Sequence, residues 1–137
     1  MPDLESFAVE VQRRHVTIVQ PRGELDLATV DTLRGALDAA VAETLRSALE
    51  GMEHGARLVL DLRGLSFIDS TGLHLLVALN ERAQRDGFQL MLLAPPAPTD
   101  RAIQVSGLDR TLPFAAPVDA VDTEPASPLP RLVEARP

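Results

Sequence analysis

The chain contains no cysteine, no lysine, no tryptophan and no tyrosine among its 137 residues. Without cysteine it forms no disulfide, no thiolate metal site and no cysteine nucleophile. Without lysine it has neither a Schiff-base amine nor a P-loop lysine. Aromatic residues make up only 3% of the chain, which argues against carbohydrate binding, base stacking and an aromatic interface. These absences exclude several large classes of enzyme and binding protein.

Positive charge is also scarce. The formal net charge is −7, and all 13 basic residues are arginines that form no basic stripe. We therefore expect no nucleic-acid partner and no binding to anionic membranes. No apolar run approaches the length of a membrane span, and residues 1–6 lack the charged-then-apolar pattern of a signal peptide. The expectation is a cytoplasmic protein without direct membrane insertion.

The chain does carry an alternation of strand and helix patterns. Hydrophobic residues make up 45% of a length that suits one domain. Alternating residues predict a hairpin of two strands at 7–11 and 16–20, and apolar runs predict strands buried on both faces at 58–62 and 89–94. Residues 112–115 are expected to form a last, edge strand. This order predicts an α/β fold with a mixed, mostly parallel sheet of four to five strands and interspersed helices.

Three helices are expected between these strands. Apolar residues recur every three or four positions from Leu27 to Met52 and predict a long first helix, capped by Thr29, that could bend or break at Gly35. The second helix is expected from the segment 69–72 to Gly87, with residues 63–68 as the connection before it. The third, shorter helix is expected from residue 99 or 100 to 106. Residues 117–137 contain five prolines and little periodicity, which predicts a domain at 1–116 and a disordered tail at 117–137.

Two polar segments follow predicted parallel strands, where functional side chains of such sheets gather. They are residues 23–26 (GELD) and residues 69–72 (DSTG). Ser70 is explained most simply as a helix cap. Gly72, however, costs a helix about 0.5–1 kcal/mol relative to alanine, and one use for it is a bare backbone that another molecule can approach. Capping and partner contact both stay open at this point.

Catalysis and metal binding find little support in the sequence. Position 68 is Ile rather than the glycine of a nucleophile elbow, and none of the three histidines is aimed at the Ser70 hydroxyl. The acids Glu24, Asp26 and Asp69 could gather around a metal, but lone acids at strand ends are more often solvated or capping. We therefore expect no enzymatic activity, no metal and no cofactor.

A serine at the start of a helix is nonetheless a good acceptor of a phosphoryl group delivered by another enzyme. The modification adds about −1.5 to −2 charges where the helix dipole favours anions. Repulsion from Glu24, Asp26 and Asp69 would then expel a partner docked across the strand ends. The position of Ser70 is therefore compatible with phosphorylation by another enzyme.

Three segments together resemble a known family. Residues 23–26 (GELD), 58–62 (LVLDL) and 67–73 (FIDSTGL), with residues 105–108 (VSGL) after them, are similar to the STAS domain shared by anti-sigma factor antagonists and sulfate transporters. The resemblance covers residues 7–116, with the segments in the family's order. Two departures are a first helix longer by roughly two turns and a proline-rich end where the family has a closing helix.

The resemblance implies an anti-sigma factor antagonist that works by partner switching. In that family the unphosphorylated protein binds an anti-sigma factor that is also a serine kinase, which frees a sigma factor for transcription. The kinase phosphorylates the serine that corresponds to Ser70, the antagonist is released, and a serine phosphatase resets it. The matching partner-binding positions are Glu24, Asp26, Asp69, Thr71 and Gly72. Phe67 and Leu73 are added as apolar neighbours, although core packing could equally explain them.

Two other functions stay open from the sequence. One is a STAS accessory subunit of a membrane transporter that works without phosphorylation. The other is a STAS module that senses a small ligand such as a nucleotide.

Overall fold

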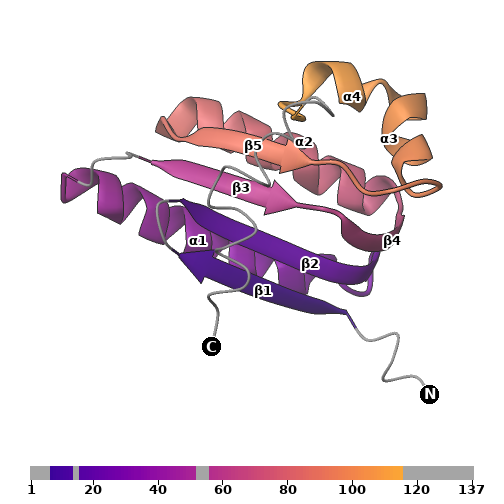
Figure 1. Ribbon diagram of the computed structural model, residues 1–137, viewed down its shortest axis with the longest axis horizontal. Coiled ribbons are helices and arrows are strands. Elements are labelled where there is room, and N and C mark those ends of the chain that lie inside the picture. The colour runs from indigo at the N-terminus through magenta and orange to yellow at the C-terminus, as the bar shows by residue number, and fades with distance from the viewer. Residues whose placement is uncertain (1–6, 14–15, 52–55, 116–137) are drawn as a thin grey trace, which may run out of the picture.

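The computed structural model describes residues 7–13, 16–51 and 56–115, and places five strands in one sheet (Figure 1). The order is β1-β2-β3-β5, with β4 also beside β2. β1 is antiparallel to β2, and the other pairs are parallel. The strands are β1 (Ala8–Arg13), β2 (Thr17–Leu25), β3 (Arg57–Asp61), β4 (Gly64–Ile68) and β5 (Gln89–Leu93). The predicted mixed, mostly parallel α/β sheet is confirmed.

β2 is the longest strand, and it changes its parallel neighbour half-way along. Residues 17–19 pair with β3, whereas residues 22–25 pair with β4. Pro21 lies between the residues of β2 that pair with β3 and those that pair with β4. Its missing backbone N–H therefore falls where the parallel pairing of β2 is already interrupted. A proline, which is unfavourable inside a strand because it lacks a backbone donor, is thus accommodated by the change of partner.

β4 is the strand that the sequence did not predict. Its register with β2 shifts between Gly23 and Glu24, whose partners are Leu65 and Phe67, so Ser66 is an extra, bulged residue. The bulge breaks the alternation of buried and exposed side chains, and Ser66 and Phe67 are both exposed. Because buried and exposed side chains do not alternate in this strand, its sequence lacks the pattern that predicts a strand. The prediction of a connecting segment at residues 63–68 is therefore wrong.

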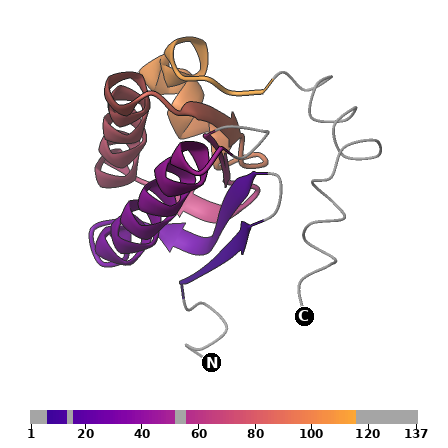
Figure 2. The ribbon, with the colours of Figure 1, turned by 90° about the vertical axis from the view of Figure 1, so that its left-hand side faces the viewer.

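The helices α1 (Val30–Leu49) and α2 (Ser70–Asp86) lie side by side on one face of the sheet (Figure 2). α1 is continuous through Gly35. Its buried stripe is shorter than the predicted one, because Leu27 lies in the turn before the helix and Leu49 at its last residue, both exposed. A helix of 20 residues extends about 30 Å, so α1 is longer than the five-residue strands of the sheet. Met52, the last member of the predicted stripe, lies outside the described residues.

The chain ends its described part beside β5. α3 (Asp100–Ser106) forms as predicted and is followed by α4 (Leu108–Thr111), which the sequence did not predict. The expected edge strand at 112–115 is a single parallel bridge between Leu92 and Phe114, because Pro113 offers no backbone donor to extend the ladder. The Ala115 N–H donates to the Leu92 carbonyl at 2.9 Å. The predicted tail at 117–137 lies outside the described residues.

Hydrophobic side chains pack on both faces of the sheet. The main cluster fills the space between the sheet and α1 and α2, and includes Leu25, Leu33, Leu60, Leu76 and Leu92. A second cluster on the opposite face consists of Ile18, Val59 and Leu93, with the partly buried Val16, Met91 and Ala115 against it. Residues 58–62 are all buried, so the prediction of a strand covered on both faces is confirmed.

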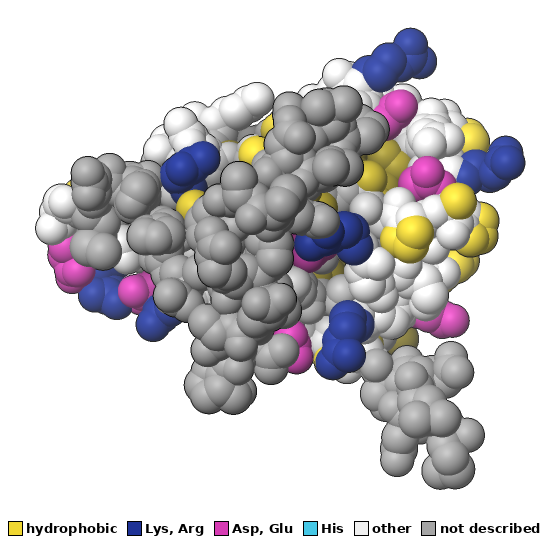
Figure 3. Space-filling model, in the orientation of Figure 1, with side chains coloured by type: hydrophobic (Ala, Val, Ile, Leu, Met, Phe, Trp, Pro, Cys, Tyr) yellow, Lys and Arg dark blue, Asp and Glu magenta, His cyan; other side chains and the backbone are white. Residues whose placement is uncertain are grey.

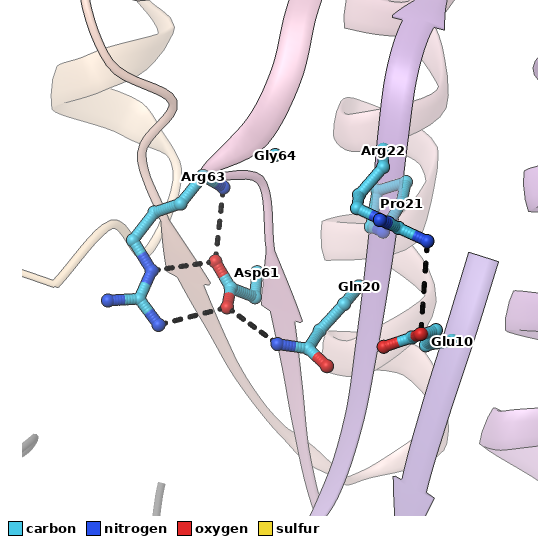
Figure 4. A pocket seen from close by; sticks show the side chains of 7 residues that line it. All are labelled: Glu10, Gln20, Pro21, Arg22, Asp61, Arg63 and Gly64. Carbon is cyan, nitrogen blue, oxygen red and sulfur yellow. Dashed lines mark hydrogen bonds and ion pairs between the residues drawn. The ribbon is translucent and has the colours of Figure 1, made fainter. Parts of the chain in front are cut away.

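An ion pair holds the chain where it passes from β3 to β4 (Figure 4). The buried Asp61 carboxylate accepts from Arg63 Nε at 2.9 Å and from Arg63 Nη2 at 3.0 Å. It also accepts from the Arg63 backbone N–H at 3.0 Å and from Gln20 Nε2 at 3.1 Å. Burial by itself would raise the pKa of Asp61, but these hydrogen bonds outweigh it and the pKa is lowered. The pair thus fixes the turn that carries the chain from β3 to its place beside the second half of β2.

Replacing Arg63 by alanine should destabilise the fold, because it leaves a buried carboxylate with fewer donors. We expect a loss of about 1–3 kcal/mol in unfolding free energy, discounted for the partial exposure of the arginine. Urea unfolding measures it, with Arg57→Ala, at the exposed start of β3, as the matched control. An Arg63→Ala protein as stable as that control would contradict the assigned role.

The same pair should make stability depend on pH. Since the pKa of Asp61 is lower in the folded than in the unfolded chain, its ionised form stabilises the fold above about pH 4. That stability is lost as the pH falls through the folded-state pKa. In Arg63→Ala, Asp61 loses the donors that lower its pKa, so the fall of unfolding free energy between about pH 6 and acid pH, measured by urea unfolding, should be smaller than in the unchanged protein.

Candidate functional site

The two polar segments singled out in the sequence meet at the end of the β2–β4 pair. Glu24 lies opposite Phe67, and Leu25 opposite Ile68. Beyond the last ladder residue, the Asp69 N–H donates to the Leu25 carbonyl at 3.2 Å. The turn after β2 and the start of α2 therefore form one continuous surface, as expected for neighbouring parallel strands.

The turn between β2 and α1 is held by its own side chains. Asp26 Oδ1 accepts from the backbone N–H groups of Ala28 at 3.0 Å and Thr29 at 3.2 Å. Thr29 Oγ1 donates to the Glu24 carbonyl at 2.6 Å and accepts from the Asp26 N–H at 3.0 Å. Thr29 precedes α1 but its hydroxyl bonds no helical amide, so it fastens this turn instead of capping the helix as predicted. Asp26 is half-buried and Glu24 is exposed.

Asp69, not Ser70, caps α2. The Gly72 N–H donates to Asp69 Oδ1 at 3.1 Å, and Asp69 has extended backbone angles while Ser70 is the first helical residue. The interpretation of Ser70 as the cap is therefore wrong. Because Asp69 is extended and the residues after it are helical, its carboxylate faces the amides of the first helical turn. Ser70 is exposed at the surface.

Gly72 is buried, and its missing side chain serves packing inside the protein. A Cβ atom at this position would lie 2.7 Å from Ile68 Cγ1 and 2.8 Å from Leu25 Cγ. Glycine therefore lets α2 approach the ends of β2 and β4 closely. The sequence suggests that the absence of a side chain at Gly72 leaves room for another molecule, but Ile68 and Leu25 of the same chain occupy that space. Contact between Gly72 and a partner stays a prediction.

Apolar side chains surround Ser70 to different degrees. Phe67 is 45% exposed, whereas Leu73 is half-buried and packs against the main cluster. Thr71 is also half-buried. Hydrophobic side chains reach the surface at the end of the molecule where β4 lies (Figure 3). Phe67 is thus a surface residue rather than a core one.

Leu27 is a surface residue that the sequence placed in the core. It is 75% exposed in the turn fastened by Asp26 and Thr29. Leu27 stands three residues before Val30, a spacing that fits the apolar stripe of a helix. The structure places Leu27 in the turn before α1, so it is not part of that stripe. Leu27 is thus an exposed apolar side chain on the turn that follows β2.

Other chemistry is limited at this surface. His74 is exposed one helical turn after Ser70, and His15 and His54 lie outside the described residues. In the described ranges, no three metal-ligating side chains come together as a possible metal site. Across these same ranges, no helix combines the length and the apolar character that crossing a membrane requires.

Comparison with known proteins decides the family. The family model of the STAS domain matches residues 7–121. The chain belongs to the STAS domain family. No curated protein matches this STAS domain in sequence.

Several solved structures share the fold of this STAS domain. An anti-sigma factor antagonist from Mycobacterium paratuberculosis is 29% identical, with a TM-score of 0.69 over 87% of this chain and 93% of that chain. The unphosphorylated form of the anti-sigma factor antagonist SpoIIAA is 24% identical, with a TM-score of 0.58 over 85% and 94%. SLC26A9 is 21% identical, with a TM-score of 0.58 over 80% of this chain but only 19% of that chain. The last two similarities show the fold alone.

The packing at Gly72 can be tested by adding one methyl group. Gly72→Ala should cost about 1–3 kcal/mol of unfolding free energy, since the new Cβ must displace the buried Ile68 and Leu25 side chains. Gly35→Ala in α1 is the matched control, because nothing lies within 4 Å of its Cβ position. That control should stabilise the STAS domain by about 0.5–1 kcal/mol. Equal effects of the two substitutions in urea unfolding would refute the close approach.

Proposed function

We propose that this STAS domain is an anti-sigma factor antagonist controlled by phosphorylation of Ser70. The observation that carries the proposal is an exposed serine at the first position of α2, beside the acidic turn that follows β2. The similarity to an anti-sigma factor antagonist at 29% identity supports it. The partner is an anti-sigma factor that acts as a serine kinase in the cytoplasm, and binding it frees a sigma factor for transcription.

The unphosphorylated surface suits a protein partner. Phe67 and Leu27 offer exposed apolar area, and Glu24, opposite Phe67 in the sheet, and Asp69, at the start of α2, add carboxylates at the same strand ends. Apolar area at the centre with charge around it is the usual composition of a protein interface. Thr71 and Leu73 are half-buried and contribute their exposed atoms to the partner-binding surface. Asp26 contributes indirectly, since its carboxylate holds the turn that presents Leu27.

A phosphoryl group on Ser70 changes this surface without requiring the fold to change. It adds about −1.5 to −2 charges at physiological pH next to the Asp69 carboxylate. The helix already has its cap in Asp69, and the N-terminal end of the helix dipole tolerates an added anion. Repulsion and bulk then disfavour the docked partner, and a serine phosphatase restores binding. None of these steps needs a catalytic residue on this chain.

The alternative functions have no observation of this structure in their favour. The similarity to SLC26A9 shows a shared fold and gives no evidence that this domain binds a transporter. A role as transporter subunit or as small-ligand sensor would leave the exposure of Ser70 beside the acidic turn without a use.

The modification itself is the first test. Incubation with the anti-sigma factor kinase and ATP should add one phosphate, which mass spectrometry of peptides locates at Ser70. Ser70→Ala should abolish it, whereas Ser66→Ala, at an exposed serine on β4, should not. Phosphate found at Ser66 or another residue in place of Ser70 would refute the assignment.

Binding provides the second test. Ser70→Glu should weaken binding to the unmodified anti-sigma factor by at least about tenfold, or 1.4 kcal/mol, while unfolding free energy changes by less than about 0.5 kcal/mol. Gln84→Glu adds the same charge to the exposed far end of α2 and should leave binding unchanged. Equal losses in both variants would mean that net charge, not the Ser70 position, controls binding.

A further inference from the structure

His74 lies on the same face of α2 as Ser70. Both residues are exposed, and they are four positions apart in the helix. Side chains with this spacing are neighbours, with about 5–6 Å between their Cβ atoms. A helical side chain also leans toward the N-terminus, so that it covers the turn before its own Cα atom. The imidazole of His74 therefore belongs to the surface around Ser70.

The backbone amides at the start of α2 are partly occupied. A helix leaves the N–H groups of its first turn without partners inside the helix, and such groups ordinarily hold a phosphate. Here the Asp69 N–H already donates to the Leu25 carbonyl at 3.2 Å, and the Gly72 N–H donates to Asp69 Oδ1 at 3.1 Å. A phosphoryl group on Ser70 thus meets fewer free amides than a helix start usually offers, and a side-chain donor beside it gains importance.

The charges around the start of α2 leave this role to His74. In the first two turns of the helix, residues 70–76, His74 is the one side chain that can carry positive charge. β4 and β5, which pack against α2, contain no charged residue. The charged residues of the turn after β2 are the acids Glu24 and Asp26, and the cap residue Asp69 adds another carboxylate. These carboxylates repel a phosphoryl group and cannot hold it.

The arginines between α1 and α2 are already ion-paired. Arg34 of α1 and Arg82 of α2 line the hollow between the two helices, together with Asp38. Arg34 pairs with Asp31, and Arg82 pairs with Asp38 at 2.6 Å. Arg82 also follows Ser70 by more than three helical turns, about 18 Å along the axis. These arginines therefore do not replace His74 beside Ser70.

We propose that His74 is a positioning residue for phosphorylated Ser70, whose imidazole donates a hydrogen bond to a phosphoryl oxygen and, when protonated, offsets part of the added charge. Phosphorylation extends the side chain of Ser70 beyond its hydroxyl oxygen, which brings acceptor oxygens toward the ring. Phosphate monoesters and imidazoles both titrate between about pH 6 and pH 7, so the phosphorylated surface becomes more negative as the pH rises through this range. Release of the partner is then more complete at the upper end. The inference rests on the proposed phosphorylation of Ser70 and adds a pH dependence to it.

Phosphorus NMR of the full chain tests the pair without a kinase or a partner. Phosphoserine inserted at position 70 during translation gives one phosphorus signal, whose chemical shift against pH gives the midpoint at which the second proton leaves. A nearby positive charge favours the dianion, so this midpoint should be lower with His74 than in His74→Gln, by about 0.5 pH unit. His74→Arg, which keeps a positive charge at the position, should restore the lower midpoint.

Gln84→His, added to His74→Gln, is the matched control. It places a histidine at the exposed far end of α2 and should leave the midpoint at the value of His74→Gln. The same midpoint in the unchanged chain and in His74→Gln would overturn the proposal. A shift restored by Gln84→His would also overturn it, because net charge would then explain the effect.

Binding to the anti-sigma factor kinase without ATP measures the effect on release. The dissociation constant of the phosphoserine protein relative to the unmodified one should rise between about pH 6 and pH 8, and by more with His74 than in His74→Gln. An equal rise in both proteins would contradict the effect on release.

The inference and the proposed function can fail separately, because translation supplies the phosphoserine. A lowered midpoint in a protein that the kinase does not modify at Ser70 would support the pair and refute the proposed function alone. An unchanged midpoint in a protein that the kinase does modify at Ser70 would refute the pair alone.

Discussion

The pairing of β4 with the second half of β2 is the constraint on which the rest of this structure depends. β3 leaves β2 after residue 19, and the chain turns at the Asp61–Arg63 pair to take up a new place further along the same strand. Because both strands then end at the same level, the turn after β2 and the start of α2 form one surface. Without this change of neighbour, Glu24 and Ser70 would lie at the ends of strands that do not pair with each other.

The surface that results combines a rigid frame with one accessible hydroxyl. Asp26 holds the turn before α1, and Asp69 satisfies the first-turn amide of Gly72. Since the capping is done by a neighbour, Ser70 is available for chemistry without weakening the helix. This separation of roles is what a reversible modification requires, because the modified and unmodified chains must share one fold while presenting different charges.

The two faces of the sheet are stabilised in different ways. α1 and α2 bury the main cluster through regular helix packing, and the close contact of Gly72 with Leu25 brings α2 down onto the strand ends. The opposite face has a smaller apolar cluster, the buried amide of Gln12 and the buried carboxylate of Asp61. Such a mixed surface suits a helix poorly, because the apolar stripe of a helix needs a continuous apolar partner.

The sequence by itself determined the elements with a clear period and the motif at Ser70. Strands buried on both faces, two amphipathic helices and the GELD and DSTG segments follow from local patterns, which need no knowledge of distant residues. The tertiary structure decided the rest: β4, whose bulge at Ser66 hides its period; the exposure of Leu27; and the inward role of Gly72. β4 and the role of Gly72 depend on contacts between residues far apart in the chain, chiefly Leu25 with Ile68 and Gly72, and such contacts leave no local periodic signal. The exposure of Leu27 depends on where the turn held by Asp26 and Thr29 ends and α1 begins.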